Sequence, residues 1–501
     1  MNRSLRYLLI LLAVASIAQV PRPGPGPHRL KRVIIVEFSE APSDWPQFNF
    51  DERHAGVNED ETAINPGNVA TMVRLFQSRL PATSDGAPAY WSAGSPRRQD
   101  HFLFFTTTTG GLVAMSGDGR IRWQTTPPAG PRWTTSSPAL DPSREYVYSY
   151  ALDGRVHKYR ILTGAEVNDG RWPVLVTKKP DVEKGSSALS IATTAAGTSY
   201  LYATVAGYPE PGDEGDYQGH VVAIRLSDAQ SVTFNVLCSY KASILGYGDC
   251  KSQQAGVWGR PGVIYNEADD SIYVATSNGP YTGNRGGTNW GNSILRLPPD
   301  LRVHRGKPLD AYTPDEYDKL DKQDLDLGSS ALALLPGQLG VHAGKDGVIR
   351  LINLADMSGH GAAGSTGGEL QRLKLPQGGF HFCAPAVWTD AQEHTWVYFA
   401  NTLGISAFEL IVDAQGPHLV GRWTGGVASN SSLVVANGVI FCASNNRMSA
   451  LDAKTGAELW VDTRMGEIHW ASPIVVNGAV FMSDLDGTVT AWALPKKVTL
   501  R

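Results

Sequence analysis

One two-part pattern recurs along the chain and constrains its fold more than any other feature. The first part is a turn of small residues that leads into a short apolar strand. Its eight copies are GSPRR at Gly94, SSPAL at Ser136, SSALS at Ser186, GRPGV at Gly259, SSALA at Ser329, CAPAV at Cys383, SSLVV at Ser431 and ASPIV at Ala471. Successive copies are 40 to 73 residues apart. The shorter spacings match a four-stranded propeller blade.

The second part of the pattern is a pair of β-rich segments around a tight turn. Clear copies are FLFFTTTTGGLVAMSGDG from Phe102, YVYSYALDGRVHKYRILTG from Tyr146, VIFCASNNRMSALDAKTGAELW from Val439 and AVFMSDLDGTVTAW from Ala479. Alternating apolar positions flanking DG, GG or NN turns are typical of β-hairpins, because these residues accept positive φ. The sequence therefore predicts an all-β, eight-bladed β-propeller with four-stranded antiparallel blades, spanning residues 44–497.

The size and composition of the chain agree with a closed repeat. With 501 residues, 42% of them hydrophobic, the chain exceeds the roughly 250 to 300 residues of one ordinary core. Its 53 glycines and 31 prolines, with only 18% charged residues, favour many turns over long solvated helices. The two long spacings predict polar insertions at residues 207–217 and 282–323. Such loops are either functional or ornamental.

The N-terminus resembles a secretory signal. Arg3 and Arg6 precede an apolar run over residues 8–14, and Ser16 and Ala18 are spaced like a signal-peptidase site. We expect residues 1–18 to be cleaved and residues 19–43 to form a proline-rich leader. The alternative, a membrane anchor, needs a longer run, since about 20 apolar residues span a bilayer. We therefore expect a secreted or periplasmic protein with no transmembrane segment in the mature chain.

Charge and cysteine content narrow the functional classes. The net charge is −4, with no basic run beyond the first residues, so nucleic acid is not an expected partner. Export permits disulfides, and Cys238 and Cys250 are close enough in sequence to form one. Cys383 and Cys442 fall in successive repeats; buried free thiols are favoured there, although a pair remains an alternative. The sequence contains no CxxCH motif for covalent haem and no CxxC cluster for zinc.

Two further motifs carry a family resemblance. They are the opening DWPQFNFDERHAGVNEDETAINPGNV, over residues 44–69, and a GxVxAL…TGxxxW-like repeat, best preserved over residues 446–460. The chain resembles the quinoprotein alcohol dehydrogenase superfamily, and its opening is similar to that of secreted polyvinyl-alcohol-dehydrogenase-like members. The resemblance implies an eight-bladed propeller that holds pyrroloquinoline quinone and calcium on its axis. Propellers with this repeat also include non-catalytic scaffold proteins.

The fourth repeat contains two candidate cofactor residues. Its stretch AGVWGRPGVIYNEADDSIYVATSNGP resembles the enzyme segment in which a tryptophan lies under the quinone and an asparagine ligates calcium. The matching residues are Trp258 and Asn278. A flat indole suits a planar cofactor, and an amide oxygen suits a hard cation. The alternatives are a tryptophan packed between blades and a turn asparagine that tolerates left-handed geometry.

The fifth repeat contains the candidate catalytic pair. Its stretch DLDLGSSALALLPGQLGVHAGKDGVIRLIN resembles the enzyme segment with the catalytic aspartate and a downstream basic residue near the quinone oxygens. Asp326 and Lys345 match these positions. Asp326 is expected to act as a general base and metal ligand, and Lys345 to bind and polarise the quinone. The alternatives are a turn-capping aspartate and a lysine in a KDG hairpin turn.

The third repeat supplies the remaining metal ligand in the enzymes. The matching segment here is YPEPGDEGDYQ, in which Glu210, Asp213, Glu214 and Asp216 are all candidates, with Glu210 and Glu214 taken as the calcium ligands. Clustered carboxylates suit calcium, but a solvated acidic loop has the same composition.

Two functions follow from these residues. The first is a secreted dehydrogenase of an alcohol or sugar that depends on pyrroloquinoline quinone and calcium and passes electrons to an external acceptor. The second is a non-catalytic extracytoplasmic propeller that presents its loops to a protein or glycan. The adjacent cysteine pair typical of methanol-type enzymes is missing, which favours the second.

Overall fold

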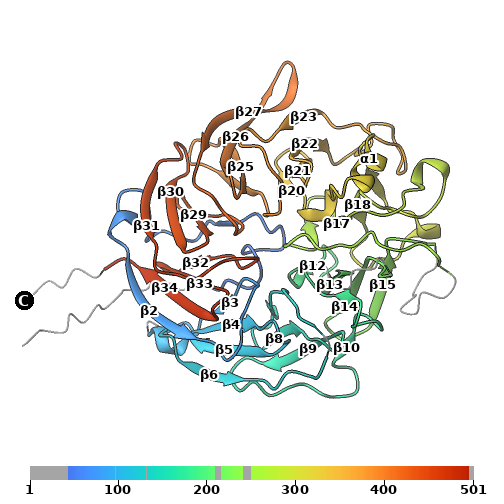
Figure 1. The fold of residues 1–501 in the computed structure, drawn as a ribbon. Helices are drawn as coiled ribbons and strands as arrows, with labels where there is room; N and C mark the ends of the chain where they lie inside the picture. The colour runs from blue at the N-terminus through green and yellow to red at the C-terminus, as the bar shows by residue number, and fades with distance from the viewer. Residues whose placement is uncertain (1–42, 96, 131, 209–215, 241–249, 496–501) are drawn as a thin grey trace, which may run out of the picture. The chain divides into compact units, whose positions relative to one another are not determined.

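The computed structural model describes residues 43–95, 97–130, 132–208, 216–240 and 250–495. Within these residues the chain forms eight small, mostly four-stranded sheets with antiparallel neighbours, arranged around a common centre (Figure 1). The predicted all-β, eight-bladed propeller is confirmed. No helix in the described part of the chain is both long and apolar enough to cross a membrane. The predicted signal peptide and nearly all of the leader lie outside the described residues.

Each of the first four blades is built in chain order. Blade 1 contains β3 (Ala89–Trp91), β4 (Phe102–Thr106), β5 (Leu112–Ser116) and β6 (Ile121–Gln124); blade 2 contains β7 (Ala139–Leu140), β8 (Tyr146–Tyr150), β9 (Arg155–Arg160) and β10 (Val174–Leu175). Blade 3 contains β11 (Glu183–Lys184), β12 (Ser190–Thr193), β13 (Ser199–Gly207), β14 (His220–Arg225) and β15 (Ser231–Asn235); blade 4 contains β16 (Ile264–Asn266), β17 (Ser271–Ala275), β18 (Ile294–Leu297) and β19 (Asp310–Tyr312).

Blades 5 to 7 follow the same order. Blade 5 contains β20 (Ala333–Leu335), β21 (Leu339–Ala343), β22 (Val348–Asn353) and β23 (Gln371–Lys374). Blade 6 contains β24 (Ala386–Thr389), β25 (Thr395–Asn401), β26 (Gly404–Asp413) and β27 (Gly416–Gly425). Blade 7 contains β28 (Val434–Ala436), β29 (Val439–Ser444), β30 (Arg447–Asp452) and β31 (Glu458–Asp462). The helical segments are short: η1 (Val69–Thr71), η2 (Arg98–Asp100), η3 (Gly283–Arg285), η4 (His304–Gly306), α1 (Tyr317–Lys322) and η5 (Leu327–Ser329).

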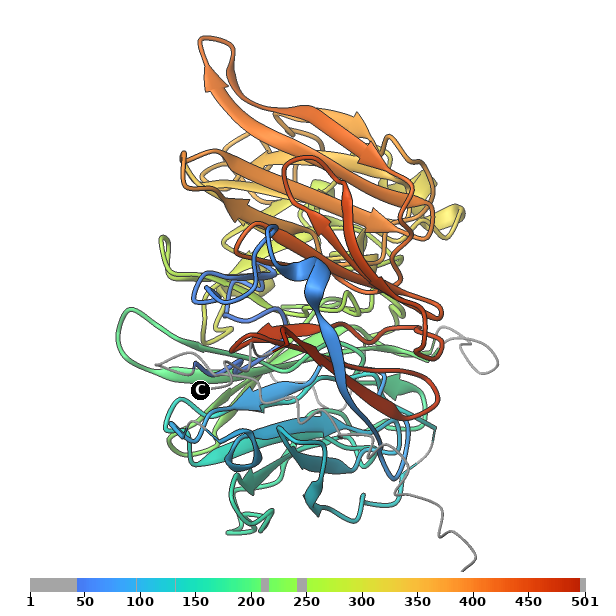
Figure 2. The ribbon, with the colours of Figure 1, turned by 90° about the vertical axis from the view of Figure 1, so that its left-hand side faces the viewer.

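Blade 8 joins the two ends of the propeller. Its strands β32 (Ile474–Val476), β33 (Ala479–Ser483) and β34 (Thr488–Ala493) come from the end of the described chain. Its outermost strand, β2 (Val73–Arg79), comes from the beginning and pairs antiparallel with β34. Figure 2 shows β2 running beside these strands. A second N-terminal strand, β1 (Val57–Asn58), adds parallel to β28 in blade 7. The ring is therefore closed by pairing between distant parts of the sequence.

The pattern of buried and exposed residues explains why neighbouring blades pack against each other. All five residues of β5 are buried, whereas the outer strand β6 is mostly exposed. Apolar side chains from neighbouring blades form shared clusters, such as the one that joins Phe105 of blade 1 to Phe481 of blade 8 and Phe441 of blade 7. Gly119 and Gly154 of the DG turns have φ of +89° and +76°, as the hairpin turns require.

Two predicted boundaries are wrong. The segment GSPRR at Gly94 follows the inner strand β3 instead of preceding it. The turn equivalent to the other seven copies is DGAP, residues 85–88, directly before β3. Residues 282–323 are not a loop insertion either, because they contain β18 and β19, the two outer strands of blade 4, as well as α1.

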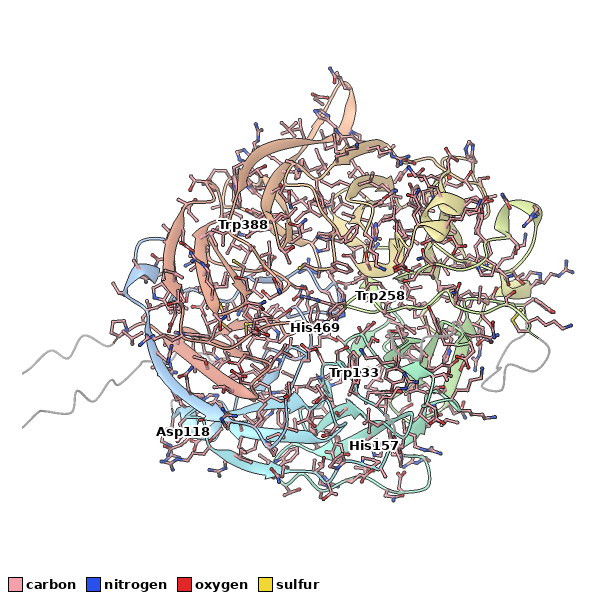
Figure 3. The ribbon with its side chains drawn as sticks, in the orientation of Figure 1. Asp118, Trp133, His157, Trp258, Trp388 and His469 are labelled. Carbon is pink, nitrogen blue, oxygen red and sulfur yellow. A yellow bond between two sulfur atoms is a disulfide. The ribbon has the colours of Figure 1, made fainter. Side chains whose placement is uncertain are left out.

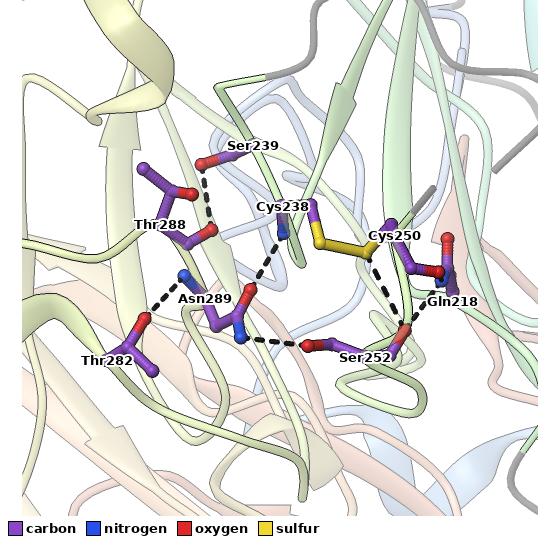
Figure 4. The surroundings of a disulfide bond; sticks show 8 residues. All are labelled: Gln218, Cys238, Ser239, Cys250, Ser252, Thr282, Thr288 and Asn289. Atoms are coloured by element: carbon purple, nitrogen blue, oxygen red, sulfur yellow. Dashed lines mark hydrogen bonds between the residues drawn. A yellow bond between two sulfur atoms is a disulfide. The ribbon is translucent and has the colours of Figure 1, made fainter. Parts of the chain in front are cut away.

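The predicted disulfide is present. Cys238 and Cys250 are joined, with their Cα atoms 5.9 Å apart, whereas Cys383 and Cys442 are buried free thiols. Figure 4 shows how the bridge is tied to blade 4. The Asn289 side chain accepts a hydrogen bond from the Cys238 backbone N–H at 2.8 Å and donates to the Ser252 hydroxyl at 3.0 Å.

Candidate functional site

A cavity of about 650 Å³ is bordered by the loops that precede the inner strands. A volume of this size accommodates a small-molecule ligand. Figure 3 places Trp133, Trp258 and His469 around the centre of the propeller, and Asp118 and His157 toward its rim. We call this space the axial cavity. Its lining residues are Trp133, Thr135, Lys184, Ser186, Ala206, Gly207, Tyr217, Gln254, Trp258, Asn278, Asp321, Asp324, Asp326, Lys345, Phe382, His469 and Trp470.

The structure brings the four described residues from the family resemblance into this one cavity. Trp258, Asn278, Asp326 and Lys345 all line it. Trp258 and Asp326 stand beside the small-residue turns of blades 4 and 5, whereas Asn278 follows β17 and Lys345 lies in the turn between β21 and β22. Their convergence shows that they belong to one site; their roles remain predictions.

Aromatic rings form much of the cavity wall. The Trp258 ring centroid lies 5.8 Å from that of Trp470 and 6.1 Å from that of Phe382, with the planes tilted by 34° and 36°. The Arg260 guanidinium is 4.5 Å from the Trp470 ring centroid and donates hydrogen bonds to the Asn430 and His469 carbonyl oxygens. This buried arginine therefore packs against the ring of Trp470 and holds it in place.

The backbone that leads to Trp258 is strained. Gln254 and Ala255 have φ of +76° and +53°, a region that non-glycine residues rarely adopt. Gly256 follows, and a Cβ there would lie 2.7 Å from the Ala206 side chain. A hydrogen bond from the Ala255 N–H to the Asn278 carbonyl oxygen holds this segment in place. The geometry brings the chain close to the neighbouring blade and sets Trp258 against the cavity.

Asp326 is the most deeply buried carboxylate of the cavity, with 6% of its surface exposed. Its Oδ2 lies 2.5 Å from Lys345 Nζ, and its Oδ1 accepts the Asn278 backbone N–H at 2.9 Å. Burial raises the pKa of Asp326, and the nearby lysine only partly offsets this. Burial alone would lower the pKa of Lys345, but Asp326 and Asp324 together raise it.

The side chain of Asn278 bridges protein groups. Its Nδ2 donates to Asp324 Oδ1 at 2.9 Å, and its Oδ1 accepts from Asn292 Nδ2 at 3.1 Å. It therefore serves as a structural link between the loop after β17 and the turn that carries Asp326.

These residues do not fit a calcium ion. The Lys345 ammonium already neutralises Asp326, and the Asn278 oxygen accepts an internal hydrogen bond. In the described ranges no group of three or more histidine, cysteine, aspartate or glutamate residues could hold a metal. Glu210, Asp213 and Glu214 lie outside the described residues. Asp216 is described, and its carbonyl oxygen accepts a hydrogen bond from Lys179. Gly207 and Tyr217, on either side of this acidic segment, line the cavity.

Lys184 is a second cation of the cavity, and sequence reasoning missed it. It is only 5% exposed, and its Nζ lies 3.4 Å from the Trp133 ring centroid. Burial lowers the pKa of Lys184 to about 7, since only the more distant charge of Asp85 opposes it. The adjacent residue Glu183 does not pair with it, because its carboxylate accepts from Thr177 and from the Gln218 N–H.

Asp85 and His469 form another pair that the sequence analysis did not find. His469 Nδ1 lies 2.6 Å from Asp85 Oδ2, and Asp85 Oδ1 accepts the backbone N–H groups of Trp470 and Ala471. Asp85 is buried, while His469 is about half exposed. The buried carboxylate thus orients the imidazole and the turn that carries Trp470.

A sequence signal for these missed residues does exist. Several lining residues stand within three positions of a small-residue turn: Trp133 before TTSSP, Lys184 before GSS, Trp258 before GRP, Asp326 before LGSS, Phe382 before CAP and Trp470 before ASP. Because every inner strand starts near the axis, the residues just before the turn that leads into it face the centre. Asp85 escaped notice since its turn, DGAP, was assigned to the wrong segment.

Comparisons with known proteins agree with this architecture. A family model described as outer membrane protein assembly factor BamB matches residues 400–497. No curated protein matches the chain. Similar solved structures include a quinohemoprotein alcohol dehydrogenase, ADHIIG, from Pseudomonas putida HK5, with 13% identity and a TM-score of 0.63 over 92% of this chain and 82% of that one.

Two further structures are comparably similar. The quinohemoprotein alcohol dehydrogenase from Comamonas testosteroni has 15% identity and a TM-score of 0.62 over 91% of this chain and 81% of that one. A europium-containing methanol dehydrogenase has the same identity and TM-score, over 91% of this chain and 98% of that one. At these identities the likeness shows a shared fold. The similarity to the polyvinyl-alcohol-dehydrogenase-like group stays a prediction.

Proposed function

We propose that the axial cavity binds a planar, anionic quinone of the pyrroloquinoline type and that the chain oxidises an alcohol or sugar. The observation that carries the proposal is the meeting of Trp258, Asp326 and Lys345 in one cavity. The fold that the chain shares with alcohol dehydrogenases supports it.

The cavity lining fits such a quinone. Tilted indole and phenyl rings offer faces for a flat ring system. The buried Nε1 of Trp470 has no hydrogen-bond partner within the described structure, so it has a donor available for a ligand oxygen. Lys184 and Lys345 provide positive charge for anionic groups. Trp258 and Trp470 would hold the ring, and Lys345 would meet its charged oxygens.

In the proposed reaction Asp326, Lys345 and the Asn278 N–H have separate roles. When bound, the quinone supplies a two-electron acceptor for the hydride of the carbinol carbon. Asp326 takes the hydroxyl proton as general base; its raised pKa makes it a stronger base than an ordinary carboxylate. Lys345 and the Asn278 N–H hold its two oxygens in a fixed orientation. An external acceptor would take up the electrons, and none of these residue roles depends on calcium.

Dye-linked turnover tests the proposal. The purified protein is incubated with pyrroloquinoline quinone, with and without calcium, and dye reduction is followed across primary alcohols, secondary alcohols and sugars. We expect turnover without added calcium. D326N should bind the quinone but lose at least a hundredfold in kcat, as removal of a general base does. D118N, at the propeller rim, is the matched control and should keep full activity.

The pH dependence provides a second readout. Since the pKa of Asp326 is raised, kcat/KM should fall on the acid side at a pH above the usual carboxylate range of about 4. D326N should lack this limb. Bound quinone without turnover of any alcohol or sugar, or turnover by D326N equal to the wild type, would overturn the proposal.

A second candidate is a non-catalytic binding propeller in the cell envelope. The match of residues 400–497 to the assembly-factor model favours it. It predicts that the quinone does not bind at all, which the same incubation measures.

A further inference from the structure

Lys184 occupies an unusual environment for a lysine. It ends β11, and its strand partner is Ala206 of β13. Successive residues of a strand face opposite sides, so Glu183 and Lys184 point apart and cannot neutralise each other. Within the described structure Lys184 has no hydrogen bond or ion pair; its close contact is the face of Trp133. A cation–π contact contributes far less than the cost of burying an unpaired charge.

The surrounding backbone holds this lysine in position. Thr134 and Thr135 of blade 2 donate hydrogen bonds to the carbonyl oxygens of Gly185 and Ser186, at 2.6 and 2.8 Å. The carboxylate of Glu183, on the other face, is bound to the Gln218 N–H. Blade 2 and blade 3 thus fix the chain on both sides of Lys184. A buried, fixed and unpaired cation that lines a cavity is an anion-binding group.

We infer that Lys184 and Trp133 form a carboxylate-binding subsite of the axial cavity, for a ligand whose carboxylate is attached to a planar ring. The ammonium pairs with the carboxylate, and the aromatic wall packs against the ring. The inference concerns binding alone, so it holds whether or not the cavity supports oxidation. The carboxylate belongs either to the cofactor or to the substrate.

Ligand binding at this subsite should be coupled to proton uptake. The other titratable groups of the cavity are Tyr217, Asp321, Asp324, Asp326, Lys345 and His469, with Asp85 behind His469. Lys184 has a pKa of about 7, so it is mostly neutral at pH 8. A bound carboxylate favours the charged ammonium, and the protein should therefore take up protons, at most one for each ligand bound at this pH.

Isothermal titration calorimetry with naphthalene-2-carboxylate tests the inference without any quinone. The neutral 2-naphthamide, of the same shape, should bind roughly 10- to 100-fold more weakly, because it lacks the charge-assisted hydrogen bond. Titrations at pH 8 in two buffers of different ionisation enthalpy measure the proton uptake. K184M should abolish both the preference for the acid and the proton uptake, whereas K184R should keep the preference.

Two lysine variants serve as controls. Lys158, in blade 2, also lies over an aromatic ring, 4.0 Å from the Tyr146 centroid, but it does not line the axial cavity. K158M should therefore bind the acid like the wild type. K345M, the second control, should keep the preference for the acid. The inference would be overturned if the wild type bound the acid and the amide with equal affinity or if K184M bound them like the wild type. It would also be overturned if K345M, and not K184M, lost the preference.

Competition identifies the source of the carboxylate. If pyrroloquinoline quinone displaces the naphthoate, the subsite holds a cofactor carboxylate; if both bind together, it holds a substrate carboxylate. Each result supports a carboxylate subsite. A failure of turnover leaves this calorimetric test unaffected, so the two proposals can fail separately.

Discussion

At the scale of single residues, the charged side chains of the axial cavity differ in how fully ion pairs and hydrogen bonds neutralise their charges. Asp326 and Lys345 neutralise each other at 2.5 Å. Asp85 is satisfied by His469 and two backbone N–H groups. Among the described residues, Lys184 is faced only by an aromatic ring and a more distant carboxylate. Because the charge of Lys184 is the least neutralised of these, an anionic ligand should stabilise Lys184 more than the other charged groups.

Replacing Lys184 should stabilise the protein at low pH. Its pKa is about 7 in the folded chain, against 10.5 for an unperturbed lysine, so between these values the unfolded chain binds more protons and stability rises with pH. Below pH 7 the buried charge costs on the order of a few kcal/mol. K184M removes this cost, so its melting temperature should exceed that of the wild type at pH 6, with a smaller difference at pH 9. Calorimetric melting at both pH values measures this. K158M is the control, and a lower melting temperature of K184M at pH 6 would contradict the explanation.

At the scale of elements, ring closure depends on the β2–β34 pair and a polar cluster beside it. The Asp462 carboxylate accepts hydrogen bonds from Arg74 of β2, from Arg464 and from the Trp492 indole of β34. These donors outweigh the effect of burial and lower the pKa of Asp462 to about 2. One carboxylate thus connects blade 7 to both chain ends within blade 8.

The variant D462N should weaken this closure. An amide cannot accept all of these hydrogen bonds and leaves the Arg74 charge unpaired, so we expect a loss of about 2 to 4 kcal/mol at pH 7. Because the pKa of Asp462 is lowered by folding, its contribution is present above pH 4 and is lost as the pH falls toward 2. Amide hydrogen exchange should be faster in β2 and β34 first. Uniformly faster exchange in all blades, or none in β2, would argue against a closure role.

The disulfide stabilises the segment between blades 3 and 4. It links residues 12 apart in sequence, and a loop of this length contributes roughly 3 kcal/mol in the chain-entropy model. The double variant C238S/C250S should melt at a lower temperature than the wild type. Dithiothreitol should lower the wild-type melting temperature to the same value and leave the double variant unchanged. A wild-type melting temperature that does not respond to full reduction would rule out this contribution.

At the scale of the whole molecule, the sequence predicted what is local and repeated. Seven of the eight small-residue turns directly precede inner strands, because each turn and its strand are contiguous. The first was misplaced: GSPRR shares the composition of the turn, but the inner strand β3 begins earlier, after DGAP. The outer strands of blade 4, ILRL and DAY, were taken for a loop because they are short and the segments around them are polar and contain glycine and proline.

Only the part of the site that lies in local sequence motifs could be predicted. Trp258, Asn278, Asp326 and Lys345 lie in two successive repeats, where a family resemblance could find them. The groups added by the structure belong to blades 1, 2, 3, 6 and 8, and ring closure brings them to or beside the cavity. Asp85 and His469 are 384 residues apart in sequence. Only the complete ring places them in contact, so no local pattern reveals the pair.

The central claim is that the axial cavity is the ligand site of this propeller. A crystal structure of the protein grown with pyrroloquinoline quinone and without added calcium tests this most directly. The account predicts difference density for a planar ring against Trp258, with carboxylate oxygens within hydrogen-bond distance of Lys184 or Lys345. Ordered quinone elsewhere on the molecule, or an empty axial cavity in crystals saturated with the quinone, would contradict it.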